Sequence, residues 1–388
     1  MNRQYKRLFE QYKTNLKNRK LGILCNQASF DFTEGKYLFQ LLKPLTEEIK
    51  LFIPEHGLFA EQQDQVTIED LSLYKSFDNT VDYISLYTSE DNRMGDLNIQ
   101  LAGLDTLIID IQDVGVRYYT YITTIGKIFK FLAKTGRELS VIIIDRRNPA
   151  GSQVEGTVLD ENFSSMIGLA GIPHRYGLTI GELSLYLKSQ NKGRFNIEII
   201  KADSGSFTIN PSPNIPGRQT CQVFSGQCLL EGTSLSEGRG TTRPFEIFGA
   251  PFLKDLSGDW NDRFNRENPE AVLRQLLFIP SFHKYRDEIC YGSQLHPGER
   301  YHSLLYTLKM LRSLNQHSPG FCWPEGPYEA GSDKSAIELL AGDIDILQYL
   351  KGDGNDREII EKMREEESRW IKLSRPFLLY PEPLFSVL

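Results

Sequence analysis

Short runs of apolar and β-branched residues recur along roughly the first 200 residues of the chain, separated by more polar segments. Runs of this length and composition are typical of strands that are buried on both faces. Because several of them alternate with stretches of helical spacing, we expect an α/β fold, with a mainly parallel sheet and helices on both of its faces. The runs expected to form strands are 21–25, 49–53, 82–87, 105–110, 138–145 and 195–200.

Apolar residues at intervals of three and four predict helices between these strands. The last of them begins with Thr179 as an N-cap and has Glu182 three residues later, which is the pattern of a capping box. In that pattern the two side chains bond to backbone N–H groups at the helix start, so the pattern predicts where the helix begins. The helices expected from this spacing are 37–45, 120–136 and 179–190.

The middle of the chain has a different texture. Between about residues 204 and 249 it is rich in Gly, Pro, Ser and Thr, and a loop of that length in a compact domain is usually functional. Helical spacing returns after residue 250, at 269–278, 300–314 and 335–350. We therefore predict a catalytic domain over 1–249, which carries the parallel sheet, and a smaller α+β domain over 250–388 that completes the cleft.

Composition narrows the functional classes. The chain is 40% hydrophobic and 24% charged, as in a globular protein, and its formal net charge is −7 without a basic block, so nucleic acid is not an expected partner. No stretch approaches the ~18 apolar residues of a membrane span. The 5 scattered cysteines predict neither a disulfide framework nor a zinc site. The basic start lacks an apolar segment, which predicts a cytoplasmic protein as written, or an exported one if a signal is missing from this chain.

Polar side chains gather where the expected strands end. The first strand is followed by Asn26, and the second by Glu55 and His56. Because the ligands of an open parallel sheet bind beyond the carboxyl ends of its strands, we expect these side chains at one crevice. The fourth and fifth strands add to the same edge Asp110, Gln112, Asp113, Arg117, Tyr118, Asp145, Arg146 and Asn148.

Each of these groups also has a structural interpretation. Glu55 fits a solvated turn or a helix N-terminus, and His56 fits a half-buried histidine whose nitrogens are satisfied. Asp110 and Asp113 could pair with Arg117 or cap the helix that follows, where an anion is favoured by the helix dipole. The same choice between ligand contact and internal pairing applies to Asp145, Arg146 and Glu155.

A second concentration of polar groups lies in the Gly-rich stretch 231–246. Glycines at 232, 238 and 240 allow its backbone to approach a ligand closely and to adopt positive φ. The alternative is an irregular loop held by its own hydrogen bonds, but the density of acids, hydroxyls and arginines favours a functional loop. These side chains are Glu231, Ser236, Glu237, Arg239, Thr241, Thr242 and Arg243.

Motifs that indicate other chemistries are absent from the sequence. It has no GxGxxG that follows a strand, no GxxxxGK[ST], no GxSxG and no HExxH. The 6 histidines are dispersed, so a histidine metal centre is not predicted, although a carboxylate site is not excluded. Paired carboxylates, one with a pKa raised by burial, are the machinery of glycoside hydrolysis. Arginines suit a sugar that itself carries a carboxylate.

Long motifs follow one another along nearly the whole chain: LGILCNQASFD, IPEHGLFAE, DIQDVGVRYYTYI, DRRNPAG with VEGTVL, RYGLTIGEL, PSPNIP, CLLEGTSLSEGRGTTRPFEIFGAP and CYGSQLHP. Together they resemble the DUF1343 family, which is named after the NamZ exo-β-N-acetylmuramidases. The resemblance implies a Rossmann-like N-terminal domain with a smaller C-terminal domain. It also implies removal of N-acetylmuramic acid from the non-reducing ends of peptidoglycan fragments, without a metal or an organic cofactor.

The resemblance also implies roles for individual residues. Glu55 in PEHG would be a catalytic carboxylate, as general acid or base, and Glu237 in SEGRG the second one, with Glu155 and Asp113 in reserve. Arg147 stands where the family's DRPNP form has Pro, and we expect altered loop stiffness rather than lost activity. The side chains expected to line the cleft are Asn26, His56, Asp110, Gln112, Arg117, Tyr118, Tyr121, Arg146, Asn148, Asn214, Glu231, Ser236, Arg239, Thr241 and Arg243.

Two other functions fit the same cleft. One is a metal-dependent esterase, deacetylase or phosphatase, which would lose its activity on chelation. The other is a cell-wall sugar-binding protein, which would bind a muramic-acid sugar without turnover. The acids at Glu55, Asp113 and Glu237 are more than binding requires, so they favour an enzyme over a sugar-binding protein.

Overall fold

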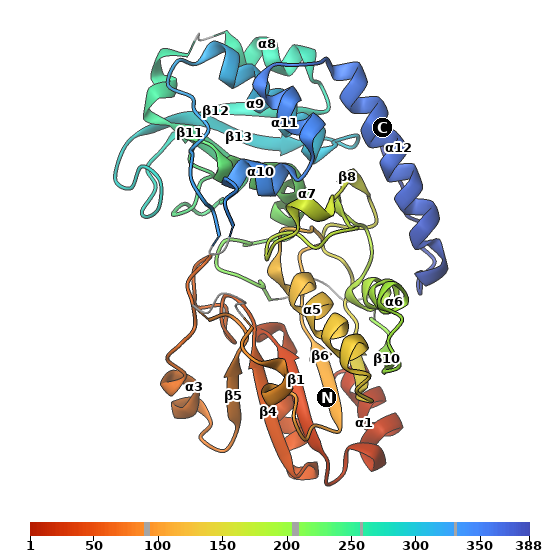
Figure 1. Ribbon diagram of the computed structural model, residues 1–388. Coiled ribbons are helices and arrows are strands. Elements are labelled where there is room, and N and C mark those ends of the chain that lie inside the picture. The colour runs from red at the N-terminus through yellow and green to blue at the C-terminus, as the bar shows by residue number, and fades with distance from the viewer. Residues whose placement is uncertain (89–93, 204–208, 257–258, 330–331) are drawn as a thin grey trace.

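The computed structural model describes residues 1–88, 94–203, 209–256, 259–329 and 332–388. The larger sheets formed by these residues lie at opposite ends of the molecule (Figure 1). A six-stranded sheet lies at the end that holds the N-terminus, and a three-stranded sheet lies at the other end. The two-domain α/β expectation is confirmed in this arrangement.

The six-stranded sheet is parallel throughout, and its strand order is β10-β7-β6-β1-β4-β5. Relabelled by their order along the chain, these strands read 6-5-4-1-2-3, which is the doubly wound order of Rossmann folds. The direction of winding reverses at the first strand, so a crevice is expected beyond its carboxyl end. The strands are β1 (Lys20–Cys25), β4 (Glu48–Ile53), β5 (Asp82–Ser85), β6 (Thr106–Asp110), β7 (Ser140–Ile144) and β10 (Asn196–Ile200).

Helices cover both faces of this sheet, as the continuous apolar runs predict. Successive strand residues alternate between two buried clusters, so that Leu24 and Phe52 join one, while Ile23 and Leu51 join the other. The first cluster packs under α5 (Thr120–Thr135) and α6 (Ile180–Asn191). The second packs under α1 (Arg3–Leu16), α2 (Leu38–Leu42) and α3 (Ser72–Phe77).

The capping box predicted for α6 is present. The Thr179 side chain accepts a hydrogen bond from the Glu182 backbone N–H, and the Glu182 carboxylate accepts one from the Thr179 backbone N–H at 2.9 Å. The helix therefore begins where the sequence indicates. Shorter elements of this half are the helix α4 (Leu97–Gln100), the hairpin of β2 (Phe30–Asp31) with β3 (Lys36–Tyr37), and the ladder of β8 (Glu155–Val158) with β9 (Pro173–Arg175).

The three-stranded sheet is antiparallel, in the order β11-β13-β12. The helix predicted at 269–278 is wrong, because this segment forms β12. Its leucines are good helix formers, but Ala271 and Leu273 are buried at alternate positions, and the whole segment pairs with β13; tertiary pairing outweighs helical propensity here. The elements of this half are β11 (Ile247–Ala250), α8 (Trp260–Glu267), β12 (Ala271–Phe278), β13 (Cys290–Pro297), α9 (Ser303–His317), α10 (Ala336–Ala341) and α11 (Ile344–Lys351).

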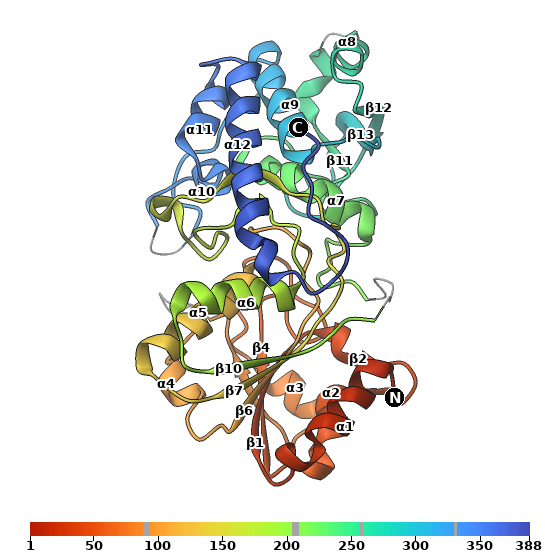
Figure 2. The same ribbon diagram turned by 90° about the vertical axis from the view of Figure 1, so that its right-hand side faces the viewer.

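Segments from both parts of the chain connect the two halves. The long helix α12 (Asp356–Ser374) runs beside both of them, as Figure 2 shows. Its Glu367 accepts the Gly156 backbone N–H at 2.7 Å, and its Trp370 indole donates to the Tyr176 carbonyl at 2.9 Å. The helix α7 (Arg218–Gln227) comes before residue 249 in the sequence, yet it packs on α9 of the second half. One apolar cluster also continues from the parallel sheet into the second half.

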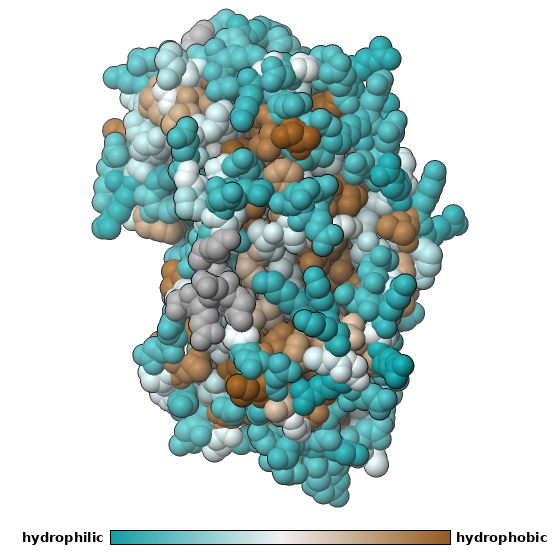
Figure 3. Space-filling view, viewed as in Figure 1, coloured by the Kyte–Doolittle hydropathy of each residue, from teal (hydrophilic) through white to brown (hydrophobic). Residues whose placement is uncertain are grey.

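Hydrophilic side chains cover most of the face shown in Figure 3, and the hydrophobic ones on it are scattered between them. Within the described ranges, no helix combines the length and the apolar character that crossing a membrane requires. Four of the 5 cysteines (Cys25, Cys221, Cys228 and Cys290) are buried as free thiols, and Cys322 is exposed.

Candidate active site

Glu55 lies just beyond the carboxyl end of β4, where Pro54 ends the strand. The Thr120 hydroxyl donates a hydrogen bond to Glu55 Oε2 at 2.6 Å, and the Gln65 backbone N–H donates to Oε1 at 3.0 Å. The residue is 7% exposed. Because each oxygen has its own donor, the carboxylate is held in one orientation at the wall of a cavity.

His56 holds an unusual backbone conformation beside this carboxylate. Its φ is 70°, in the left-handed region that a residue with a side chain seldom adopts, and such strain is concentrated at functional sites. His56 Nδ1 lies 3.1 Å from the Gln62 carbonyl oxygen, which can only accept, so Nδ1 carries the proton. In the neutral ring the other nitrogen, Nε2, is then an acceptor. The ring centroid lies 5.6 Å from that of Tyr119.

A cavity lies between the loop after β4, the start of α5, the Gly-rich stretch and Tyr328, and we call it the Glu55 cavity. Its volume is about 50 Å³, room for a few water molecules. Since small-molecule sites measure about 300–1,000 Å³, a sugar enters only if these walls move apart. The lining residues are Glu55, His56, Asp64, Gln65, Tyr118, Tyr119, Thr120, Ile167, Ser212, Asn214, Ile215, Phe224, Cys228, Glu231, Arg239, Phe245, Tyr328 and Leu340.

Arg239 joins the β4 loop to the Gly-rich stretch through carboxylates. Its Nη1 lies 3.0 Å from Asp64, its Nη2 lies 2.7 Å from Glu231, and its Nε lies 3.1 Å from Glu237. The guanidinium is also 5.1 Å from the centroid of the Phe245 ring. Burial disfavours its charge, but these carboxylates outweigh burial and raise the pKa of Arg239. Its guanidinium nitrogens are thus already engaged, which leaves little capacity for a further anion.

Glu231 is the carboxyl group of this cavity best suited to hold a proton. Its Oε2 accepts the Tyr328 hydroxyl at 2.5 Å, and its side chain is 10% exposed. Burial raises the pKa of Glu231, and the charges of Asp64 and Glu237 add to that effect, while Arg239 opposes it. A buried acid with a raised pKa that faces a second carboxylate is the usual arrangement for general acid catalysis.

Glu237, expected as the second catalytic carboxylate, has a different environment. It is fully buried, with His283 Nδ1 at 2.8 Å, Lys284 Nζ at 3.2 Å and Arg239 at 3.1 Å. Burial opposes its ionisation, but Lys284, His283 and Arg239 outweigh it and lower the pKa of Glu237 to about 2. Glu237 does not line the Glu55 cavity. A carboxylate that stays ionised near neutral pH behind the wall fixes Arg239 and gives no proton to a ligand.

Several residues expected in the same crevice line a different cavity. Gln112, Arg146 and Asn148 border a space of about 460 Å³, called the second cavity below. Arg147, the departure from the family's motif, borders it too, with its guanidinium 4.0 Å from the Tyr380 ring centroid. The carboxyl edge of the sheet thus carries two spaces rather than one.

Buried polar contacts engage the other acids of the sheet edge. Asp110 accepts hydrogen bonds from Arg146 at 2.5 Å and from the Tyr5 hydroxyl at 2.6 Å. Asp113 accepts the Gly115 backbone N–H at 2.7 Å and the Tyr176 hydroxyl, and burial raises the pKa of Asp113 to about 7. Neither residue lines the Glu55 cavity.

Two further expected site residues act behind the walls. The Asn26 side chain donates to the Gln112 carbonyl at 3.1 Å. Tyr121 donates to the backbone carbonyls of Glu55 at 3.3 Å and Pro211 at 3.0 Å. Both side chains are fully buried, and their bonds fix the backbone near the sheet edge.

Arg117, expected in the cleft, instead connects the two halves. It donates to the carbonyls of Thr157 at 3.0 Å, Leu340 at 3.1 Å and Ala341 at 2.9 Å, and burial lowers the pKa of Arg117 to about 10. The guanidinium also lies 2.9 Å from the ring nitrogen Nε2 of His174. These partners belong to segments far apart in the sequence, so Arg117 has a structural role.

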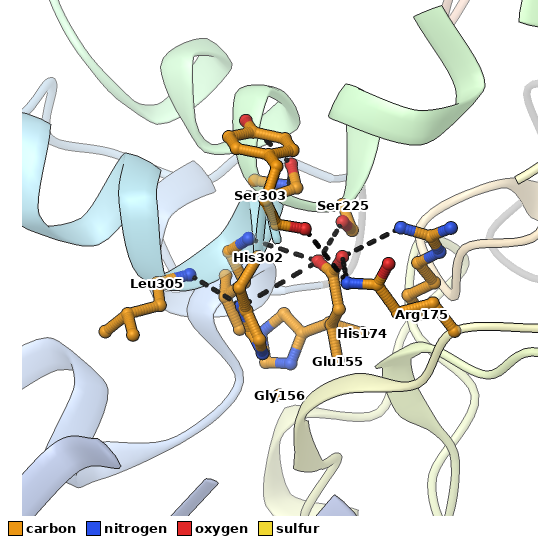
Figure 4. Close-up of polar contacts among 12 residues, drawn as sticks. Glu155, Gly156, His174, Arg175, Ser225, His302, Ser303 and Leu305 are labelled. Atoms are coloured by element: carbon orange, nitrogen blue, oxygen red, sulfur yellow. Dashed lines mark hydrogen bonds and ion pairs between the residues drawn. The ribbon is translucent and has the colours of Figure 1, made fainter. Parts of the chain in front are cut away.

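Glu155 is the centre of a second connection between the halves, drawn in Figure 4. Its carboxylate lies 2.8 Å from Arg175 and accepts the Ser225 hydroxyl at 2.6 Å. The neighbouring His302 accepts the Leu305 backbone N–H at Nδ1, at 3.1 Å, so that Nε2 donates to Glu367 at 2.8 Å. None of these residues lines the Glu55 cavity.

The remaining residues of the Gly-rich stretch stabilise the stretch itself. The Ser236 hydroxyl accepts the Gly238 backbone N–H at 3.2 Å, and the Thr241 hydroxyl donates to the Gly238 carbonyl at 2.6 Å. Arg243 is half-exposed and pairs with Glu246 at 3.1 Å. Gly238 has a φ of 77°, and a Cβ there would lie 2.5 Å from the Ile247 carbonyl oxygen, so this position requires glycine.

Sequence reasoning missed six polar residues of the Glu55 cavity: Asp64, Gln65, Tyr119, Thr120, Ser212 and Tyr328. Thr120 lies within the quoted motif DIQDVGVRYYTYI, and its hydroxyl before a helix was the available signal. Asp64 and Gln65 follow no strand, and Tyr328 lies far along the chain, so no pattern connected them to Glu55.

In the described ranges, no group of three or more His, Cys, Asp and Glu side chains is placed to hold a metal ion.

Comparison with known proteins gives two family matches that divide the chain between them. The model described as the N-terminal part of the exo-β-N-acetylmuramidase NamZ matches residues 21–219, and the model of its C-terminal part matches residues 222–380. A relative from Bacillus subtilis (strain 168), the peptidoglycan β-N-acetylmuramidase NamZ, is 29% identical over 389 residues, which cover 96% of this chain and 90% of the relative.

Two solved structures share the fold. Both are DUF1343 family proteins from Bacteroides fragilis. One has a TM-score of 0.77 at 23% identity, over 97% of this chain and 98% of the other. The second has a TM-score of 0.68 at 25% identity, over 96% and 97% of the two chains.

Proposed function

Since this chain belongs to the NamZ family of exo-β-N-acetylmuramidases, matched over residues 21–219 and 222–380, we propose that it hydrolyses terminal N-acetylmuramides at the Glu55 cavity. The family assignment makes the protein a glycosidase of peptidoglycan turnover. The bond broken is the β-glycosidic bond of a terminal N-acetylmuramic acid at the non-reducing end of a glycan.

The observation that carries this proposal is the presence of Glu55 and Glu231 in the wall of one cavity. Their environments differ as the chemistry requires. Burial raises the pKa of Glu231 above its ordinary value, which favours the protonated form that a general acid needs. Glu55 has a donor on each oxygen, which fixes its direction. An acid and an oriented carboxylate at one site are the two groups that glycoside hydrolysis needs.

In the proposed reaction Glu231 donates its proton to the glycosidic oxygen as the bond from that oxygen to the anomeric carbon breaks. The leaving sugar departs as a neutral alcohol. Glu55 assists the attack on the anomeric carbon, as a base that takes a proton from water or as a nucleophile that water later displaces. The anomer released first, followed by NMR, distinguishes these two roles of Glu55.

Neighbouring groups prepare both carboxyls. Thr120 and Gln65 orient Glu55, and Tyr328 and Arg239 orient Glu231. His56 Nε2, an acceptor in the neutral ring, is available for a sugar hydroxyl. Asn214, which donates to Gln63 at 2.7 Å, and Tyr118 complete the polar wall of the Glu55 cavity.

The test is turnover of a chromogenic β-N-acetylmuramide and of peptide-free glycan chains, with the matching β-N-acetylglucosaminide as the control. We expect release of N-acetylmuramic acid and little turnover of the control, because only the muramide carries the lactyl group. Release that stops on chelation would indicate the metal-dependent alternative, and saturable binding without release would indicate a binding protein. Either result would overturn the proposed mechanism.

A further inference from the structure

The second cavity contains motif residues that the proposed hydrolysis does not use. Gln112, Arg146 and Asn148 line it, beyond the carboxyl ends of β6 and β7. Its volume of about 460 Å³ lies within the range of about 300–1,000 Å³ that is typical of small-molecule sites. A position beyond the carboxyl ends of parallel strands is also where α/β folds bind ligands. Size and location therefore both suit a ligand.

Two arginines have free donor capacity in this cavity. Arg218 Nε donates to the Pro149 carbonyl at 3.1 Å, and no side chain in the described part of the protein pairs with its terminal nitrogens. Arg146 bonds through Nη2 to Asp110 and to the Ala28 carbonyl, while its buried Nε has no hydrogen-bond partner among the described residues. A buried N–H without a partner is costly, and an anion would satisfy it.

The acids that line the second cavity do not offset this capacity, because each already has partners. Two of the carboxylates pair with an arginine at 2.8–2.9 Å, which compensates their charge, and the third accepts two backbone N–H groups at the same distances, which stabilise its charge without cancelling it. They are Glu182 with the N–H groups of Thr179 and Leu379, Asp203 with Arg7, and Glu382 with Arg147.

The rest of the wall combines a helix start with apolar side chains. Arg218 is the first residue of the ten-residue helix α7, and its N-cap, Gly217, offers no side chain to the free backbone N–H groups there. These groups and the helix dipole add to the attraction of Arg218 for an anion. Leu378 and Leu384 of the C-terminal segment supply the apolar part.

We propose that the second cavity binds a small carboxylate-bearing ligand, of the size of one amino sugar or a dipeptide, with Arg218 and Arg146 as its anion contacts. Guanidinium matches a carboxylate bidentately, which makes this class of ligand the best fit. Two sources of such a group are the lactyl carboxylate of N-acetylmuramic acid and the acidic residue of an attached peptide. Only the choice of these sources rests on the proposed function, because the cavity is separate from Glu55 and Glu231.

The experiment is calorimetric titration of the full chain with N-acetylmuramic acid and, separately, with L-alanyl-D-glutamate. N-acetylglucosamine and L-alanyl-L-alaninamide, which both lack a carboxylate, are the ligand controls. The variant Arg218→Gln removes the free guanidinium, and Arg369→Gln, on the exposed face of α12, is the matched loss of charge.

At least one of the two acids is expected to bind saturably. Arg218→Gln should weaken that binding by at least about tenfold, and Arg369→Gln should leave it unchanged. The acid that binds identifies the source of the carboxylate. Absence of saturable binding by both acids, or binding to Arg218→Gln as tight as to the wild type, would overturn the proposal. Turnover of the small chromogenic substrate should be unchanged in both variants, so a failure of the proposed hydrolysis is detected separately.

Discussion

The Thr120 hydroxyl donates a hydrogen bond to Glu55 Oε2 at 2.6 Å, although 65 residues separate them in the chain. Glu55 lies just beyond the last residue of β4, and Thr120 is the first residue of α5. The sheet edge and the helix start therefore fix one carboxylate between them. Glu55 depends on this contact for its direction, since its other oxygen is held only by a backbone N–H among the described residues.

Replacing Thr120 by Val removes the donor and keeps the shape of the side chain. We expect kcat on a chromogenic muramide to fall by about 10- to 100-fold with KM changed little, because misorientation of a catalytic group acts on the reaction step. Thr120→Ser keeps the hydroxyl and should retain most of the activity. Wild-type kcat in Thr120→Val would show that Glu55 does not need this contact.

Glu237 should stabilise the fold rather than the reaction. Its folded pKa of about 2 lies below the ordinary value of 4.5, so its contribution is present above about pH 4.5 and is lost as the pH falls towards 2. Glu237→Gln should lower the free energy of unfolding at pH 7 by roughly 3 kcal/mol, and the difference from wild type should shrink between pH 5 and pH 3. Urea unfolding at these pH values measures it, with Glu365→Gln on exposed α12 as the control. Equal stability of Glu237→Gln and wild type at pH 7 would contradict this role.

Asp113 should have the opposite pH dependence. Burial raises its pKa from 3.8 to about 7, so the folded state binds the extra proton and stability falls as the pH rises from about 4 to 7. Asn stays neutral and can still accept the bond from Tyr176. Asp113→Asn should therefore be more stable than wild type at pH 8, by up to about 4 kcal/mol, and close to it at pH 4. Thermal unfolding at both pH values tests this, and a variant less stable than wild type at pH 8 would refute it.

Arg117 should act on stability without acting on the chemistry. Lysine keeps the charge but lacks the planar fork that reaches the carbonyls of Thr157, Leu340 and Ala341. Arg117→Lys should lower the free energy of unfolding by about 2–4 kcal/mol, with kcat unchanged in the folded fraction, whereas Arg364→Lys on exposed α12 should alter neither. A fall in kcat at unchanged stability would return Arg117 to the site.

Strand ends are the part of the site that the sequence could predict. The apolar run at 49–53 became β4, and the residues after it, Glu55 and His56, line the cavity as expected. The run predicts a strand because a strand buried on both faces needs continuous apolar residues. Asp110 is the last residue of β6 and Asp113 follows it, yet Arg146, Tyr5 and Tyr176 engage them, because one strand edge carries both ligand-facing and structural polar groups.

Tertiary contacts determine the remaining site residues and elements, and a local sequence pattern does not show such contacts. Glu231 and Glu237 lie six residues apart in the same Gly-rich stretch, and both are acids in a dense polar motif. Only the fold puts Tyr328 against the first, and Lys284 and His283 against the second. The same limit explains β12, whose leucines suit a helix until β13 pairs with them.

The most direct test of the account is a comparison of kcat/KM for wild type, Glu55→Gln, Glu231→Gln and the double variant on a chromogenic β-N-acetylmuramide. If the two carboxyls act as one catalytic unit, kcat/KM falls by about 10²- to 10⁴-fold in each single variant. In the double variant kcat/KM should be close to that of the less active single variant, because the losses of groups that act together do not add. Turnover like that of the wild type in either single variant, with the protein folded, would contradict the pairing of Glu55 with Glu231.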